Sequence, residues 1–440
     1  MKIPIIKIAI AGAMTGLTSI SMAAAVEYRD ALDIAVAPPE QVVAGVERTD
    51  RFILYVGNTL TYDNNIYRLP GSVTDLSTLP GIGSSPSRED YIDSISGGLD
   101  AEWLTGARQS VDVDLRADYN RFFRNQDLNN VSTSDRVVWN WGLTDALSGK
   151  VGADYTRLLG GFTNTAVFSR DIVNRSDYFA SMRYQVGPRW GIFGGLMGTD
   201  YSVTAADATF NNSKTKAVDV GADFTAETNR IGFDYRYNDS RASNSAFLNG
   251  VLFDPDYREE RARVLLRYAF TEKTLVDASA GYLRRQYPST AIGSFSGEIW
   301  RVALQWQPTP KTQVLFGAWQ QLDADLTAQT DYFVDKGVSI TPEWIASEKL
   351  TFSANISRDN QNYIGSNPVG VVPVATLTQA RHDTLTGATA NMIYTPIRAI
   401  TLTVSAGHVT RNSNISQFHY NDMQGSVNIV YKFFRYGNAP

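Results

Sequence analysis

The segment SVDVDLRADYN, residues 110–120, alternates strictly between two kinds of side chain. Odd positions carry the apolar or small residues Val111, Val113, Leu115, Ala117 and Tyr119, and even positions carry the charged residues Asp112, Asp114, Arg116 and Asp118. A period of two is that of an extended strand, because successive Cβ atoms leave opposite faces. The segment therefore predicts a strand with an apolar environment on one side and water on the other.

The same alternation recurs along most of the chain. Apolar residues at positions i, i+2 and i+4 do not gather on one face of a helix, so helical patterns fit poorly. The sequence predicts strands near 52–62, 91–104, 108–122, 134–143, 149–158, 177–186, 189–202, 214–226, 229–240, 257–270, 274–287, 294–307, 311–323, 330–345, 348–359, 380–394, 398–411 and 419–434. About eighteen strands is an even number within the range of outer-membrane barrels.

The connections between these strands alternate in length. Tight turns such as 187–188 and 227–228 alternate with long polar loops such as 63–90 and 241–256. This alternation places the tight turns at one end of the fold and the long loops at the other. We therefore predict an all-β fold, a transmembrane up-and-down antiparallel β-barrel with short periplasmic turns and long extracellular loops. In hydrocarbon every backbone N–H and C=O needs a partner, so the sheet has to close on itself.

Bulky apolar residues, most of them aromatic, gather near the predicted turn ends. They are Trp103, Leu104, Trp139, Trp141, Trp190, Trp306, Trp344, Tyr394, Phe433 and Phe434. Membrane barrels carry aromatic girdles at their interfaces. A β-sandwich, the alternative fold, would not bias aromatic residues toward the strand ends.

The N-terminus is typical of an exported protein. Lys2 and Lys7 precede a short apolar stretch and three alanines, as in a secretory signal peptide. We predict a signal peptide over 1–25, a periplasmic N-terminal segment over 26–50, the barrel over 51–434 and a C-terminal tail over 435–440. The expected location is the outer membrane of a Gram-negative cell, with outer-membrane lipid and the barrel-assembly machinery as partners. The chain has no cysteine for disulfides, and its net charge of −5 without a polybasic run excludes a nucleic-acid partner.

The charged residues at alternate positions of the strands are predicted to line a lumen, since sixteen to eighteen strands leave an aqueous channel. The candidate pore-lining residues are Asp112, Asp114, Arg116, Asp118, Asp154, Arg183, Asp219, Asp223, Asp234, Arg236, Arg261, Arg263, Arg267, Asp277, Arg285 and Arg301. Acidic groups dominate the third to ninth strands and arginines the ninth to twelfth. An acidic wall that faces a basic wall would orient polar solutes by a transverse field. For any single residue we favour the alternative that it belongs to a ladder of ion pairs.

Catalysis is not expected. The three histidines His382, His408 and His419 share the apolar parity of their strands, so they point away from the lumen. Neither a G-x-S-x-G nor an H-x-x-E-H signature accompanies them. We predict no enzyme activity, no cofactor and no metal site.

One stretch after the first strand departs from the alternation. TYDNNIYRLP, residues 61–70, begins a loop of Gly, Ser and Pro that runs to about residue 90. Its Asp and Asn residues favour an Asx-turn. The loop is long enough to fold into the barrel mouth as a constriction, and an exposed loop is the alternative. The candidate constriction residues are Tyr62, Asp63, Asn64, Asn65, Tyr67 and Arg68.

A strand that ends in Tyr-Asp-Asn-Asn-Ile-Tyr-Arg-Leu-Pro and is followed by repeated hairpins resembles the EpsL-type outer-membrane barrels of exopolysaccharide operons. The resemblance implies a channel that translocates an exopolysaccharide or capsular polysaccharide to the cell surface. It also implies a polysaccharide substrate and a periplasmic polysaccharide-export protein as partner. Two other functions stay open from the residues alone: a general or substrate-selective porin for small solutes, and a plugged structural or adhesion barrel.

Overall fold

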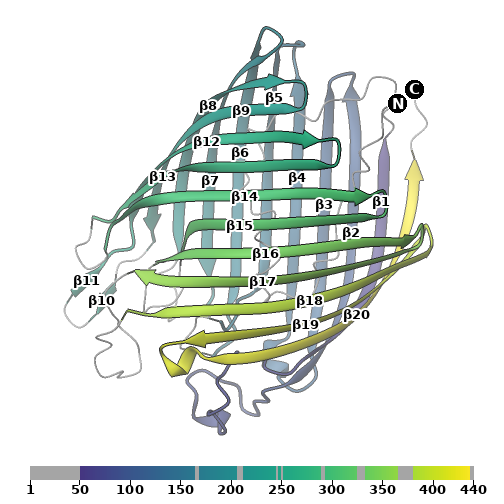
Figure 1. Cartoon of the computed structure of the whole chain (residues 1–440). Helices are drawn as coiled ribbons and strands as arrows, with labels where there is room; N and C mark the ends of the chain where they lie inside the picture. Colours follow the sequence, from purple (N-terminus) through teal and green to yellow (C-terminus); the bar gives the residue numbers. More distant parts are fainter. Residues whose placement is uncertain are drawn as a thin grey trace.

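The chain folds into one closed antiparallel β-barrel, shown by a computed structural model that describes residues 50–163, 168–205, 212–243, 246–248, 251–288, 293–324, 332–364 and 380–436 (Figure 1). The barrel contains eighteen strands, as the sequence predicts. Their bounds are β1 (Arg51–Asp63), β2 (Asp90–Gly106), β3 (Gln109–Phe122), β4 (Asn130–Gly142), β5 (Leu147–Leu159), β6 (Ile172–Val186), β7 (Trp190–Val203), β8 (Ser213–Ala226), β9 (Asn229–Ala242), β12 (Tyr257–Thr271), β13 (Thr274–Gln286), β14 (Phe295–Thr309), β15 (Thr312–Ala324), β16 (Tyr332–Ser347), β17 (Leu350–Ile364), β18 (His382–Ile397), β19 (Ile400–Ser413) and β20 (Tyr420–Tyr436).

The barrel closes between its first and last strands. Each strand pairs with its neighbour in the chain, β9 pairs with β12, and β1 pairs with both β2 and β20. Arg51 lies opposite Tyr436, and Asp63 lies opposite Gln424 at the other end of the seam. Closure leaves no strand edge in the membrane, where an unpaired backbone group would be costly.

The lengths of the connections follow the predicted alternation. Tight turns lie at the end that holds both ends of the barrel chain, and long loops lie at the other end (Figure 1). Gly187 begins the β6–β7 turn with a φ of 66°, a backbone conformation that glycine adopts without strain. We refer below to the turn end and the loop end of the barrel.

Two features differ from the sequence-based expectation. The predicted loop 241–256 contains a small hairpin of β10 (Ala246–Leu248) and β11 (Val251–Phe253). The last strand continues to Tyr436, two residues beyond the predicted barrel end. The predicted signal peptide and most of the N-terminal segment lie outside the described residues. No helix in the described part of the chain is long and apolar enough to cross a membrane.

The two faces of the wall have the predicted character. On β8, Val218 and Val220 are 45% and 51% exposed, whereas the intervening Asp219 is fully buried. Near the turn end, Trp103, Trp190 and Trp344 are all more than half exposed on the outer face. Exposed apolar side chains on the outer face and polar side chains on the inner face are the pattern that lipid outside and water inside require.

Candidate functional site

The predicted pore-lining residues all lie at the alternate strand positions whose side chains face the inside of the barrel. On β3, for example, Leu115 and Tyr119 are 37% and 49% exposed on the outer face, and the charged residues between them alternate to the inside. The same relation holds on β5, β6, β8, β9, β12, β13 and β14. The folded barrel therefore brings these residues together on one surface. Their role in lining an open passage is taken up under the proposed function.

Many of these inner charges neutralise one another between strands that are adjacent or one strand apart. Asp223 on β8 accepts a hydrogen bond from Arg183 on β6 at 2.7 Å and forms an ion pair with Arg230 on β9 at 2.6 Å. Arg236 Nε lies 2.9 Å from an oxygen of Asp219, and both side chains are at most 1% exposed. Removing one member of such a buried pair leaves an uncompensated charge. The β6–β12 part of the wall is thus the ion-paired ladder that the sequence offered as the alternative for single residues.

Acidic and basic parts of the inner wall lie across the barrel from each other. Strands β2 and β3 carry the carboxylates of Asp100, Glu102, Asp112, Asp114 and Asp118 on their inner faces, with Arg116 among them. Strands β12 to β14 carry Arg261, Arg263, Arg267, Arg285 and Arg301, with Glu259 and Asp277 among them. β3 is the third and β14 the twelfth of eighteen strands, so they are nine places apart in the closed ring. The sequence predicts an acidic wall over the third to ninth strands, but the acids that lie opposite the arginines are on β2 and β3, because the β8 and β9 carboxylates pair with arginines.

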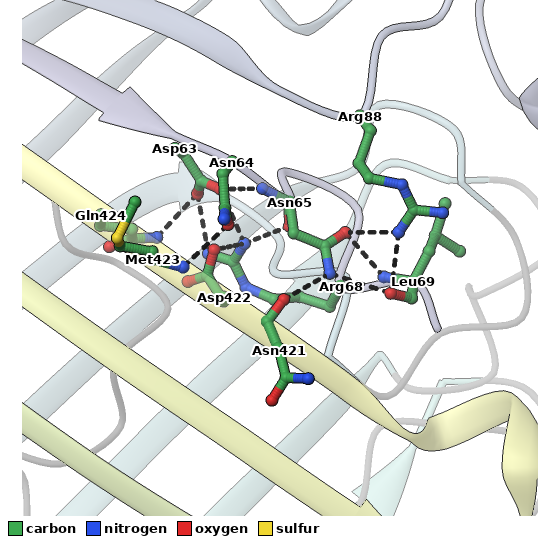
Figure 2. A network of polar contacts seen from close by, with 10 residues as sticks. All are labelled: Asp63, Asn64, Asn65, Arg68, Leu69, Arg88, Asn421, Asp422, Met423 and Gln424. Carbon is green, nitrogen blue, oxygen red and sulfur yellow. Dashed lines mark hydrogen bonds and ion pairs between the residues drawn. The ribbon is translucent and has the colours of Figure 1, made fainter. Parts of the chain in front are cut away.

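The segment after β1 forms a buried polar network with β20 at the loop end (Figure 2). Arg68 Nη2 lies 2.9 Å from Asp63 Oδ2, and its Nη1 lies 3.1 Å from Asp422 Oδ1. Gln424 donates from Nε2 to Asp63 Oδ2 at 2.7 Å. The side chains of Arg68, Asp63 and Asp422 are 3%, 5% and 2% exposed. We call Asp63, Arg68, Asp422 and Gln424 the seam clasp, because they join the first strand to the last.

Two asparagines extend the contacts of the seam clasp through the backbone. Asn64 donates its N–H to Met423 O at 3.1 Å, and Met423 donates its N–H to Asn64 Oδ1 at 2.8 Å. Asn65 donates its N–H to Asp63 Oδ1 at 2.8 Å, which confirms the predicted Asx-turn. Asn65 also donates from Nδ2 to Asn421 O at 2.9 Å. The motif therefore acts as a fastening of the barrel seam.

Electrostatics favours the charged form of the clasp arginine and the neutral form of the adjacent tyrosine. Burial opposes the charge of Arg68, but the Asp63 carboxylate outweighs it and raises the pKa of the guanidinium. Burial, with the nearby carboxylates Asp127 and Asp90, raises the pKa of the Tyr67 phenol to about 12. Arg68 adopts a φ of 55°, unusual for a residue with a side chain, and the clasp contacts hold it there.

The same loop covers part of the loop-end mouth of the barrel. Tyr67 packs on Phe162 of the β5–β6 loop, with ring centroids 4.9 Å apart. Phe122, which has inner parity on β3, belongs to the same buried apolar cluster. Arg411 on β19 donates to the carbonyl of Thr163 at 2.5 Å. The β1–β2 and β5–β6 loops therefore meet over the mouth and reach the wall at β19. We call these two loops the mouth cap.

The predicted constriction residues take different places in this arrangement. Asp63, Asn65 and Arg68 are buried in and around the seam clasp, and Tyr67 is buried in the mouth cap. The prediction for Tyr62 is wrong, because its side chain lies on the outer face of β1. It donates to Glu89 Oε2 at 2.8 Å, and its ring lies 5.0 Å from that of Tyr91, which is 45% exposed.

Sequence reasoning missed an acidic stretch of the inner wall. Asp323, Asp335, Glu343 and Asp359 have inner parity on β15 to β17, and described strand residues offer no Lys or Arg on those inner faces. Asp335 Oδ2 accepts a hydrogen bond from Trp319 Nε1 at 2.6 Å. The alternation of charged and apolar residues is weak here because a second charged residue stands next to the inward-facing one, as in Asp335-Lys336 and Arg358-Asp359. The period of two is therefore lost at these positions.

The histidines lie as their parity predicts, as far as they belong to strands. His382 and His408 are exposed on the outer faces of β18 and β19, and His419 lies in the short turn before β20. Among the described residues no group of three or more His, Asp or Glu side chains is arranged to hold a metal ion.

Comparisons with known proteins find one family model and a set of solved structures. A family model described as "putative beta-barrel porin 2" matches residues 251–433. Solved structures with a similar fold include Pseudomonas aeruginosa OccK2 (OpdF) in complex with glucuronate, at 9% identity and a TM-score of 0.46 over 88% of this chain and 98% of that chain. Acinetobacter baumannii OccAB2 has 9% identity and a TM-score of 0.47 over 88% and 98% of the two chains. The outer membrane protein opdK from Pseudomonas aeruginosa has 9% identity and a TM-score of 0.47 over 88% and 99%.

These similarities concern the barrel and carry no information on a ligand. A search of curated proteins gives no match. The matching family model gives no specific support to the exopolysaccharide family that the motif after β1 resembles. What is shown for this chain is the closed eighteen-stranded antiparallel β-barrel, with a match to a porin family model over residues 251–433.

Proposed function

We propose that this protein is a passive porin for small polar solutes in the outer membrane, with acidic and basic walls opposite each other in its lumen and with its long loops outside the cell. The observation that carries the proposal is the inner wall of the closed barrel. It is polar and charged along most strands, while the outer face is apolar. A ring of eighteen strands is wide enough to leave an aqueous passage between its walls.

The distribution of charge supports selectivity among small solutes. Acidic side chains on β2 and β3 lie across the ring from basic side chains on β12 to β14. Such opposed walls orient a dipolar or charged solute and bind it weakly at several places, which is what conduction requires. Conduction by weak binding needs neither a cofactor nor a moving part.

The mouth cap supports small solutes over a polymer. Its buried apolar cluster of Ile66, Tyr67, Leu69, Phe122, Leu128 and Phe162 occupies part of the loop-end opening. A polysaccharide chain would have to pass that cluster or displace it. Export of an exopolysaccharide, the function that the resemblance implies, therefore has less support than diffusion of small solutes.

The proposal is tested by ion selectivity in planar bilayers. Asp100 and Asp114 lie directly opposite each other on the inner faces of β2 and β3. We expect the wild-type protein to form steady conducting channels. The double variant Asp100→Asn/Asp114→Asn should shift the reversal potential in a KCl gradient toward that of an anion-preferring channel, because two negative charges leave the lumen.

A matched control removes two carboxylates from the outer face. Asp200 on β7 and Asp239 on β9 have outer parity near the loop end. Asp200→Asn/Asp239→Asn should leave the reversal potential at the wild-type value. Absence of any wild-type conductance, or equal shifts of the reversal potential in the two double variants, would contradict a conducting lumen whose charged walls set its ion selectivity.

A further inference from the structure

Strands β16 and β17 carry their charges on opposite faces of the wall. Asp335 and Asp359 face inward and are 7% and 6% exposed. Their neighbours in sequence, Lys336 and Arg358, face outward and are exposed. Neither cation forms an ion pair with a described residue, although each is adjacent in sequence to a carboxylate. The two positive charges are therefore directed away from the acids of the lumen and toward the surroundings of the barrel.

The outward cations lie close together in a patch that contains no acid. In the register of β16 and β17, Lys336 is opposite Asn360 and Val338 is opposite Arg358, so the two cations are diagonal neighbours. Asn360 Oδ1 accepts from Thr384 Oγ1 at 3.1 Å, and this leaves the Asn360 amide N–H₂ free to donate. Among the described residues of β15 to β19, no outward-facing position carries Asp or Glu. We call Lys336, Arg358 and Asn360 the outer basic patch.

The patch lies at the loop-side margin of the apolar band. Val338 and Ile356, the next outward residues toward the turn end, are 57% and 54% exposed. Toward the loop end, the next outward residues of β17 and β18 are polar, namely Asn360, Asn362, Thr384 and His382, with Asn362 and His382 in contact at 2.8 Å. A membrane barrel places such a change from apolar to polar at the level of the lipid headgroups. The cations are therefore at headgroup depth.

A hollow in the apolar band lies below the patch on the same part of the wall. Ala354, Ala390 and Ala406 are opposite one another on β17, β18 and β19. They line, with Phe352 and Met392, an apolar cavity of about 530 Å³ on the outer face. Ala354 is four residues from Arg358, roughly 13 Å along the strand. An acyl chain that hangs from a headgroup at the patch would reach the upper part of this hollow.

We propose that the outer basic patch binds the phosphate of a phosphorylated glycolipid in the leaflet at the loop end, with an acyl chain directed toward the hollow below. Lysine and arginine are the side chains that bind phosphate, and arginine does so through two parallel N–H groups. The patch supplies both cations and a neutral amide donor with no competing carboxylate. The inference rests on the orientation given in the proposed function, with the long loops outside, and not on conduction through the lumen.

The experiment measures lipid retention by native mass spectrometry. Full-length protein in detergent micelles is mixed with diphosphorylated lipid A or with its dephosphorylated form. We expect the wild-type protein to retain the diphosphorylated lipid. Lys336→Gln/Arg358→Gln should bind it about thirty-fold more weakly, the effect of two cations near an anionic lipid surface. The dephosphorylated lipid should bind equally weakly to both proteins.

The control keeps the net charge of the double variant but changes the other end of the barrel. Lys311 and Lys349 are exposed in turns at the turn end. Lys311→Gln/Lys349→Gln should retain the diphosphorylated lipid like the wild type. Equal retention by the wild type and Lys336→Gln/Arg358→Gln would overturn the proposal, and so would equal loss in both double variants. A barrel that conducts no ions but shows the expected lipid pattern would contradict only the proposed function.

Discussion

Replacing Arg68 with alanine is expected to lower the free energy of unfolding of the barrel by about 3–5 kcal/mol, the usual cost of removing one partner of a buried ion pair. The guanidinium is in contact with both Asp63 and Asp422, so its loss leaves two carboxylates buried without their cation. These residues join β1 to β20, and the loss falls on the seam that closes the ring. The measurement is the urea unfolding transition of protein refolded into lipid vesicles, followed by tryptophan fluorescence.

The matched control is an exposed ion pair between the β3–β4 loop and the β1–β2 loop. Arg124 lies beside Glu89 with side chains 47% and 42% exposed. Arg124→Ala should change stability by at most about 1 kcal/mol, because surface ion pairs contribute little. If Arg68→Ala unfolded at the same urea concentration as Arg124→Ala, the clasp would not hold the seam closed.

The second large effect concerns the mouth cap. Deleting residues 74–86 and joining Val73 to Ser87 with a short Gly-Ser linker removes the middle of the β1–β2 loop and its contacts with the β5–β6 loop, whereas the contact of Tyr67 with Phe162 lies outside the deleted residues. Phe168 then loses the hydrogen bond from its N–H to Pro80 O, which is 2.9 Å long. Leu76, Leu79 and Ile82 no longer pack against the buried cluster. We expect a large increase in single-channel conductance, because the loop-end opening becomes wider and better hydrated.

The deletion leaves the seam clasp intact, so loss of the fold is not expected. Migration of the unheated protein in electrophoresis, which differs between folded and unfolded barrels, checks this point. A folded deletion variant with wild-type conductance would show that the mouth cap does not limit passage.

The barrel was predictable because its pattern is local. Lipid on one side and water on the other impose a period of two on each strand, and closure requires an even number of strands when both ends lie on the same side. Segments such as 110–120 and 218–224 display that period without interruption. Neither the signal peptide nor the solute is tested by the described residues.

The clasp and the acidic stretch of β15 to β17 were not predictable for two different physical reasons. The clasp depends on partners that are far apart in the chain, since Asp63 and Gln424 are separated by 361 residues. Nothing in the sequence near Arg68 indicates that its carboxylate partners include Asp422. The acidic stretch does not stand out in the sequence because the outward-facing Lys336 and Arg358 are next to inward-facing carboxylates. Two consecutive charged residues interrupt the alternation that identifies an inner face.

The sixteen charged residues predicted for the lumen all face inward, whereas the residues predicted for the constriction lie in several different places. Both results follow from what the alternation along a strand can predict. Parity within a strand fixes which face a side chain takes, as it does for Asp114 and Arg301. Parity gives no information within a loop, where Tyr67 enters the mouth cap. Tyr62 still belongs to the strand, and its even position already places it outside with Leu60.

A water-filled lumen for small solutes is tested most directly by the swelling of liposomes that contain the purified protein. The liposomes are transferred to isotonic solutions of sugars and amino acids of increasing size, and light scattering follows the entry of solute. We expect swelling with the smallest solutes, a steep decrease in rate as solute size increases, and no entry of a long oligosaccharide. No swelling with any solute, or equal rates for a monosaccharide and a long oligosaccharide, would contradict a passive porin with a capped mouth.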